Sequence, residues 1–246
     1  YFSNPEFMKS NTKEPAGKDE FWIVDNQLTF NKMQVLADSL RFDRKYILIP
    51  ELVPSTHYNV TTKEVYAVPI VEKNVYGPFC YANREEGIYW WEPPKVARTY
   101  RSCKHVAYLP NLCVNERQNS VVAALRFFNQ IDFYDLKGTY QRSFTYGKEP
   151  IVPLLKKNDT QVDVLGTTKC FIDIFGTDQY VYCLYDGSAD FSNLSTLLVL
   201  SWDGQLKKRL NFDRSIKRIA VDPSDRFLVA LALDESGALD VVKYSI

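Results

Sequence analysis

Two carboxylates on predicted neighbouring strands are the side chains in this sequence best placed to do chemistry. Asp173 lies in the apolar run that begins at Ile172, and Asp222 directly follows the run that begins at Ile219. Glycoside hydrolysis uses a pair of carboxyl groups about 5–10 Å apart. If both strands line one channel, the pair is a candidate for ligand binding or catalysis. Each residue also has a structural interpretation, Asp173 as polar lining and Asp222 as the capping residue of a VDPSD turn.

Consecutive aromatic residues form a second candidate site. Tyr89, Trp90 and Trp91 are followed by Pro93 and Pro94, which end the strand and place Trp91 near a rim. An exposed indole ring can stack on a sugar, so Trp90 and Trp91 are candidate ligand contacts. Consecutive strand residues point to opposite faces of a sheet, and in a fold of packed sheets both faces can meet a neighbouring sheet. The alternative is therefore that both indoles pack in the core.

The cysteines and histidines do not form a metal-binding pattern. The chain has 5 Cys and 2 His, and no two cysteines are spaced as CxxC. We expect buried, inert thiols, no metal and no cofactor. The sequence pattern places no Ser or Cys partner beside His57 or His105, so each is expected to be an ordinary loop or strand residue. GxGxxG, P-loop, HExxH and GxSxG segments are also absent from the sequence.

The composition disfavours several classes of function. The 246 residues include 30 Lys+Arg and 30 Asp+Glu, which gives a formal net charge of zero, and 46% are hydrophobic. Binding to nucleic acid or to an anionic membrane surface needs a basic excess gathered on one face, so we expect neither partner. No run of about 18 apolar residues exists that would span a membrane. The length and apolar content predict a folded globular protein.

Short apolar runs predict an all-β fold. Most runs are about four to eight residues long, rich in β-branched and aromatic residues, and bounded by Asp, Asn, Gly or Pro. The best helical pattern covers residues 30–40, but a strand over 29–35 fits the same residues and we prefer it.

A strand–turn–strand unit is repeated along the chain. Three segments align: LCVNERQNSVVAALRF from Leu112, IDIFGTDQYVYCLYD from Ile172 and IAVDPSDRFLVALALD from Ile219. Asn119, Asp178 and Asp225 share one turn position in this alignment. Two earlier units begin near residues 17 and 57, so five units follow one another with a period of roughly 50 residues.

Two of the units continue into a hairpin. Residues 131–144 align with 197–210, which places Gly138 on Gly204, and glycine supplies the positive φ of a tight hairpin or bulge. The last strand of the second hairpin carries Lys207–Arg209, as expected for a strand that faces solvent. Four strands per unit, placed radially, predict a β-propeller.

We predict one β-propeller domain over residues 1–246, built of four-stranded antiparallel blades. Five blades are visible. The last one supplies strands over 216–221, 227–233 and 239–244 but no outermost strand. Propellers usually take that strand from the amino-terminal end, and the residues before Phe21 are already used. We therefore expect that an amino-terminal portion is missing and that the intact protein has six blades.

Several segments together resemble the TolB-like six-bladed propeller family, which comprises envelope lipoproteins of Gram-negative bacteria. They are FWIVDNQLTFNKMQV, VYAVPIV, GIYWWEPP, LLVLSWDGQLKKRL and IKRIAVDPSDRFLVALA. The family's signal peptide, lipidated cysteine and Gly-Pro-Glu-like motif are not found in this sequence. The resemblance implies a propeller in the periplasm or on the outer-membrane surface, with any lipid anchor on the missing amino-terminal portion. It supplies no catalytic residues.

The leading hypothesis is a non-enzymatic envelope propeller that binds a protein or glycan through loops at one end of its channel. Its candidate ligand contacts are Trp90, Trp91, Asp173 and Asp222. The rival is a propeller-fold glycosidase, or another sugar-active enzyme, that uses inner-strand carboxylates. An intracellular scaffold of the WD type is disfavoured, because the single Trp202-Asp203 dipeptide has no accompanying Gly-His.

Overall fold

The computed structural model consists almost entirely of antiparallel strands. It describes residues 20–24, 29–48, 55–61, 64–69, 77–83, 85–95, 97–157, 160–234 and 236–246. These residues group into two compact units, Tyr1–Glu92 and Pro93–Ile246, here called unit 1 and unit 2. In the described part of the chain, no helix is long and apolar enough to cross a membrane.

Unit 1 contains two antiparallel sheets whose strands follow chain order. The first consists of β1 (Glu20–Val24), β2 (Thr29–Val35) and β3 (Leu40–Leu48), and the second of β4 (Ser55–Val60), β5 (Val65–Pro69), β6 (Phe79–Asn83) and β7 (Gly87–Trp91). The strand preferred over a helix at residues 29–35 is confirmed as β2. The units predicted near residues 17 and 57 therefore each form a sheet. In these two units the repeat places Asp19 and Lys63 at the turn position shared by Asn119, Asp178 and Asp225. Both Asp19 and Lys63 lie outside the described residues.

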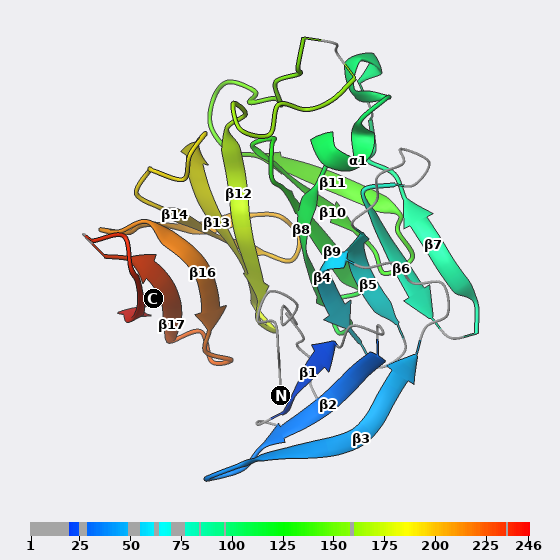
Figure 1. The fold of residues 1–246 in the computed structure, drawn as a ribbon, viewed down its shortest axis with the longest axis vertical. Coiled ribbons are helices and arrows are strands. Elements are labelled where there is room, and N and C mark those ends of the chain that lie inside the picture. The colour runs from blue at the N-terminus through cyan, green and yellow to red at the C-terminus, as the bar shows by residue number, and fades with distance from the viewer. Residues whose placement is uncertain are drawn as a thin grey trace. The chain divides into compact units, whose positions relative to one another are not determined.

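Unit 2 contains three more antiparallel sheets (Figure 1), preceded by the short helices η2 (Arg98–Tyr100) and α1 (Lys104–Ala107). The first sheet consists of β8 (Pro110–Asn115), β9 (Ser120–Leu125), β10 (Gln130–Tyr134) and β11 (Tyr140–Thr145). The second consists of β12 (Lys169–Gly176), β13 (Tyr180–Ser188), β14 (Thr196–Ser201) and β15 (Leu206–Asn211). The third consists of β16 (Ile216–Val221), β17 (Phe227–Leu233) and β18 (Leu239–Ser245). These are the strands predicted for the last blade.

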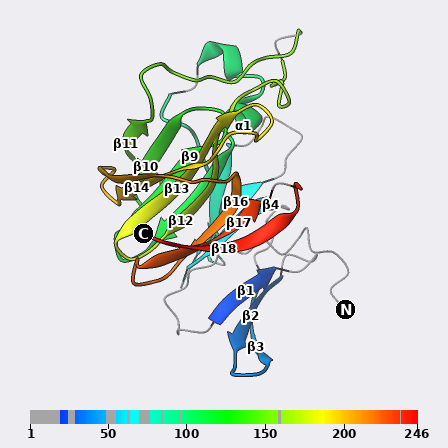
Figure 2. The ribbon, with the colours of Figure 1, turned by 90° about the vertical axis from the view of Figure 1, so that its left-hand side faces the viewer.

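The first strands of the three sheets in unit 2 lie next to one another. β12 contacts both β8 and β16, and Figure 2 shows β16 beside β12. A side-chain amide also joins two of these strands, since Asn111 Nδ2 donates to the Phe171 carbonyl at 2.9 Å. Consecutive meanders that meet through their first strands are blades of a propeller. The predicted all-β propeller of antiparallel blades is confirmed, with four described strands in three of the sheets and three in the others.

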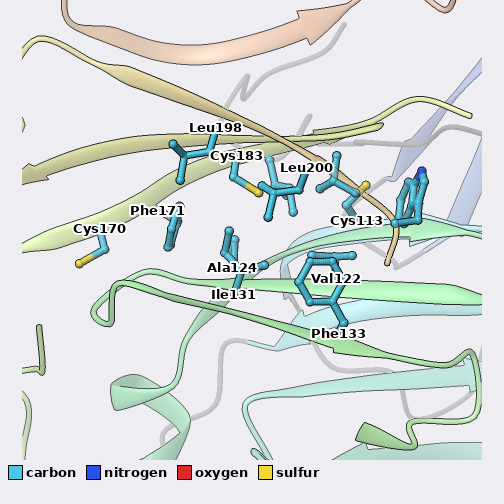
Figure 3. Close-up of a cluster of buried hydrophobic side chains, with 13 residues drawn as sticks. Cys113, Val122, Ala124, Ile131, Phe133, Cys170, Phe171, Cys183, Leu198 and Leu200 are labelled. Carbon is cyan, nitrogen blue, oxygen red and sulfur yellow. The ribbon is translucent and has the colours of Figure 1, made fainter. Parts of the chain in front are cut away.

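The second sheet of unit 2 is buried on both faces. Phe171 and Cys183 pack against the first sheet, in the cluster drawn in Figure 3. Ile172, Tyr182 and Leu184 pack against the third sheet on the other side. Because successive strand residues alternate between faces, a strand between two neighbours must be apolar at nearly every position. This explains why the runs in the sequence are continuous rather than alternating.

Glycine fixes the hairpins between the last two strands of both complete blades in unit 2. Gly138 and Gly204 have φ of 84° and 82°. Their N–H groups donate to the carbonyls of Asp135 (3.0 Å) and Ser201 (2.8 Å). The strand register shifts beside both turns. The predicted equivalence of these glycines and their positive φ are confirmed.

The shared turn position of the repeat is only partly correct. Asn119 and Asp225 both adopt left-handed backbone conformations, with φ of 48° and 57°. Asp178 does not, because its turn is shorter and closes through Thr177 N–H to the Tyr180 carbonyl at 2.8 Å. The alignment therefore predicted the position of this turn correctly but did not predict that it is shorter than the other two.

Candidate functional site

Asp173 lies buried on β12 and joins two neighbouring first strands. Its Oδ2 accepts a hydrogen bond from the Ile219 backbone N–H on β16 at 2.9 Å. A buried backbone donor needs such an acceptor, so the carboxylate has a clear structural role. Its predicted contact with a ligand stays a prediction.

Asp222 follows β16 and caps the turn into β17, as its structural interpretation predicted. Its carbonyl accepts from Asp225 N–H at 2.8 Å, and its Oδ2 accepts from the Ser224 hydroxyl at 2.5 Å. The pKa of Asp222 is lowered, first by this hydroxyl and then by groups of Arg226. Its side chain thus stabilises the turn locally, and its ligand role remains untested.

The two tryptophans lie on β7, the last strand of its sheet. Trp91 is buried and contacts Phe79 and Tyr66 edge to face, with ring centroids 4.9 and 5.8 Å apart. Trp90 points to the opposite face and is half-buried. The core alternative is therefore confirmed for Trp91. These tryptophans belong to unit 1, whereas Asp173 and Asp222 belong to unit 2.

Among β8, β12 and β16, the first strands of the three sheets in unit 2, Asp173 is the single carboxylate. The described residues contain no group of three or more His, Cys, Asp or Glu side chains able to hold a metal ion. All five cysteines are buried and none forms a disulfide. Burial lowers the pKa of His105 on α1, and the side chain of His57 lies outside those described.

A cluster of basic side chains that the sequence analysis missed lies at one end of unit 2. We call Arg126, Lys169, Lys217 and Arg218 the cation cluster. Arg126 directly follows β9, Lys169 begins β12, and Lys217 and Arg218 lie near the start of β16. In antiparallel meanders, the end of a second strand and the beginnings of neighbouring first strands lie at the same end of the blades.

An aromatic ring lies at the centre of this cluster. Phe191, between β13 and β14, has a left-handed backbone with φ of 62°. Its ring centroid is 5.8 Å from Arg126 Cζ, 5.7 Å from Lys169 Nζ and 5.3 Å from Lys217 Nζ. A ring face attracts cations, so Phe191 helps to hold three like charges near one another.

Backbone carbonyls fix the two lysines. Lys169 Nζ donates to the carbonyls of Leu165, at 3.0 Å, and Ala189. Lys217 Nζ donates to the Phe191 carbonyl and to Ser215 Oγ, both at 2.9 Å. Lysine charges are thus held in place mainly by neutral oxygens.

Arg126 is the least compensated member of the cluster. Its Nε is buried and has no hydrogen-bond partner. Its guanidinium forms no ion pair within the part of the chain that the structure describes. Burial and the neighbouring Arg218 both lower the pKa of Arg126. A cation in this position carries a desolvation cost that no protein anion offsets.

One buried carboxylate accompanies the cluster. Asp186 Oδ1 accepts from Ser188 N–H at 2.8 Å and from the Ser188 hydroxyl, while its buried Oδ2 has no partner. Asp186 and Asp190 act electrostatically on Lys217, yet burial still lowers the pKa of that lysine. The pKa of Lys169 is lowered by burial and then by Arg126. The positive charge of the cluster is therefore incompletely neutralised.

Solved structures are similar to this chain at low sequence identity. A member of the DUF4221 family from Bacteroides vulgatus is similar with a TM-score of 0.53 and 9% identity, over 94% of this chain and 91% of that one. Hydrazine synthase from Kuenenia stuttgartiensis is similar with a TM-score of 0.51 and 11% identity, over 91% of this chain and 61% of that one. The β-propeller domain of Cps50 (Swd1) from Myceliophteria thermophila gives a TM-score of 0.46 and 10% identity, over 97% and 83%. No protein-family model and no curated protein matches the chain.

Proposed function

We propose that this chain is a non-enzymatic β-propeller that binds a partner through carboxylates at the cation cluster. The observation that carries the proposal is the state of Arg126, a partly buried guanidinium that forms no ion pair with any residue the structure describes. A carboxylate bound at the exposed part of this guanidinium would supply the missing negative charge through strong charged hydrogen bonds.

The surroundings of Arg126 support the same ligand chemistry. Lys169 and Arg218 add positive charge, and Phe191 covers part of the site with an apolar ring. Electrostatic attraction is stronger where water is excluded, so an anion would gain more here than at an open surface lysine. The buried charge costs stability, and such costs are typical of functional sites.

The cell envelope is the location that we propose for this activity. The support is the resemblance of the strand segments to the TolB-like lipoprotein family. A six-bladed form and a lipid anchor are proposed on the same ground. A protein or a glycan with carboxylate groups fits the cluster chemically. Detection of the native protein in a cytosolic rather than an envelope fraction would contradict the location.

Calorimetric titration tests the proposed binding. The purified chain is titrated at low salt with tetraglutamate and with a tetramer of a uronic acid. The test variant is Arg126→Met. The control is Arg117→Met, which removes an arginine that is 63% exposed and pairs with Asp178 in the same unit. We expect the wild type and the control to bind at least one anion, and Arg126→Met to lose about tenfold or more in affinity, since one charged hydrogen bond is worth that much.

Two results would contradict the proposal. One is that neither anion binds the wild type. The other is that Arg126→Met binds as tightly as the control. The affinity should also fall between low and physiological salt, because partly exposed charges are screened.

A further inference from the structure

Exposed leucines lie beside the cation cluster. Leu165 is 86% exposed, Leu194 is 62% exposed and Leu154 is 54% exposed. A single exposed leucine needs no explanation. Several at one end of a unit, around a buried cation, indicate a surface with both apolar and electrostatic character.

The hydrogen bonds of Lys169 bring the segments that carry these leucines together. Lys169 Nζ donates to the carbonyl of Leu165, in the connection from β11 to β12, and to that of Ala189, in the connection from β13 to β14. Asn193 Nδ2 donates to the Asp186 carbonyl at 3.2 Å, which holds the chain next to Leu194. Both connections lie at the end of unit 2 that carries α1 (Figure 1). The leucines therefore flank the cations on two fixed segments.

The connection from β11 to β12 also forms a shallow cavity. It has a volume of about 570 Å³ and is lined by Leu155, Lys156, Lys157 and Asp163. Asp163 Oδ1 accepts from the Gly166 N–H at 3.2 Å, next to Leu165, whose carbonyl accepts from Lys169, so the cavity adjoins the cation cluster. Its two lysines and one leucine repeat the combination of charge and apolar surface found around Arg126.

We infer that the partner is an acidic peptide segment with apolar side chains, a conclusion that rests on the proposed function. Its carboxylates would meet the partly exposed cations Arg126, Lys217 and Arg218. Its aliphatic side chains would cover Leu165 and Leu194. Leucine side chains offer no hydrogen bonds to sugar hydroxyls, which disfavours a glycan. Asp163 and Asp190 lie at the same end of the unit, so negative charges stand among the positive ones. An anionic bilayer binds best to a surface that is basic throughout, which disfavours a membrane as the partner.

Fluorescence anisotropy with matched peptides tests the inference. The first labelled peptide alternates Glu and Leu, and the second alternates Glu and Ser with the same length and charge. We expect the Glu/Leu peptide to bind about tenfold tighter, because burying leucine side chains adds apolar contact. Leu165→Ser and Leu194→Ser should weaken only the Glu/Leu peptide, each about three- to tenfold. Val241→Ser, at a 67% exposed position on β18, is the matched control and should change neither affinity.

Each other outcome has a defined meaning. Equal affinity for the two peptides, unaffected by the leucine variants, would overturn the inference and leave anion binding in place. Tighter binding of a uronic acid tetramer, or of vesicles containing about 30% phosphatidylserine, than of the Glu/Leu peptide would overturn it in favour of a glycan or a membrane. Binding of no anion at all would overturn the proposed function together with the inference.

Discussion

At the scale of single residues, the candidate site consists of side chains whose charge is unusually costly to bury. Arg126 has no anionic partner among the residues that the structure describes. Asp186 accepts from Ser188, two residues away on the same strand. Asp173 instead accepts from a backbone N–H on a neighbouring sheet and so maintains the fold.

Replacement of Arg126 should not weaken the fold. Arg126→Met removes a partly buried charge and keeps the length of the side chain. We expect the free energy of unfolding in urea to stay the same or rise by about 1 kcal/mol. Arg117→Met should shift it by less than about 0.5 kcal/mol, because that pair is exposed. A loss above about 2 kcal/mol for Arg126→Met would assign Arg126 a structural role.

Replacement of Asp173 should weaken the fold. Asp173→Ala leaves the buried Ile219 N–H without its acceptor, so we expect a loss of about 1–3 kcal/mol in the free energy of unfolding. Asp173→Asn keeps an acceptor oxygen and should lose less. Asp178→Ala, which breaks an exposed pair, should lose under about 1 kcal/mol. Equal stability of Asp173→Ala and the wild type would refute the role of the carboxylate in joining β12 to β16.

At the scale of elements, the sequence predicted strands and hairpins well, because their signals are local. The positive φ of Gly138 and Gly204 followed from two aligned segments. The cation cluster was missed because its members are far apart in the chain and meet only through strand topology. The signal was present, since Arg126 directly follows an apolar strand and Lys169 begins one. Reading charges at the ends of aligned strands would have found it.

The hairpin glycines give a prediction at this scale. Gly237 has φ of 80° and open space where a Cβ would lie, so Gly237→Ala should cost about 1 kcal/mol from backbone strain alone. A Cβ on Gly204 would lie 3.2 Å from the Phe133 ring of the neighbouring blade. Gly204→Ala should therefore cost about 1 kcal/mol more, measured by urea unfolding. If the two variants are equally stable, crowding between these blades is not significant.

At the scale of the whole molecule, a net charge of zero conceals a local concentration of cations. The balance of 30 basic and 30 acidic residues correctly describes the chain as a whole. It says nothing of how charges gather at the ends of strands, which tertiary structure decides. The placement of Trp91 in a core likewise depends on the aromatic neighbours that β5 and β6 supply.

The thiols report on the integrity of the native state. All five are buried and outside any disulfide, and burial raises the pKa of Cys80 and of Cys170 to about 12. Because the thiolate is the reactive form, we expect almost no reaction with a thiol reagent at pH 8 in the native protein. In denaturant all five should react. Rapid reaction of the native protein would show that the cores around them open readily.

The most direct test of the central claim is a titration that observes Arg126 itself. In a two-dimensional NMR spectrum of arginine side chains, the Nε–H signal of Arg126 is assigned by its absence in Arg126→Met, and tetraglutamate is then added. We predict a saturable shift of this signal, with the signal of Arg117 nearly unchanged. An Arg126 signal that stays in place while tetraglutamate binds, or that moves no more than the signal of Arg117, would contradict the account.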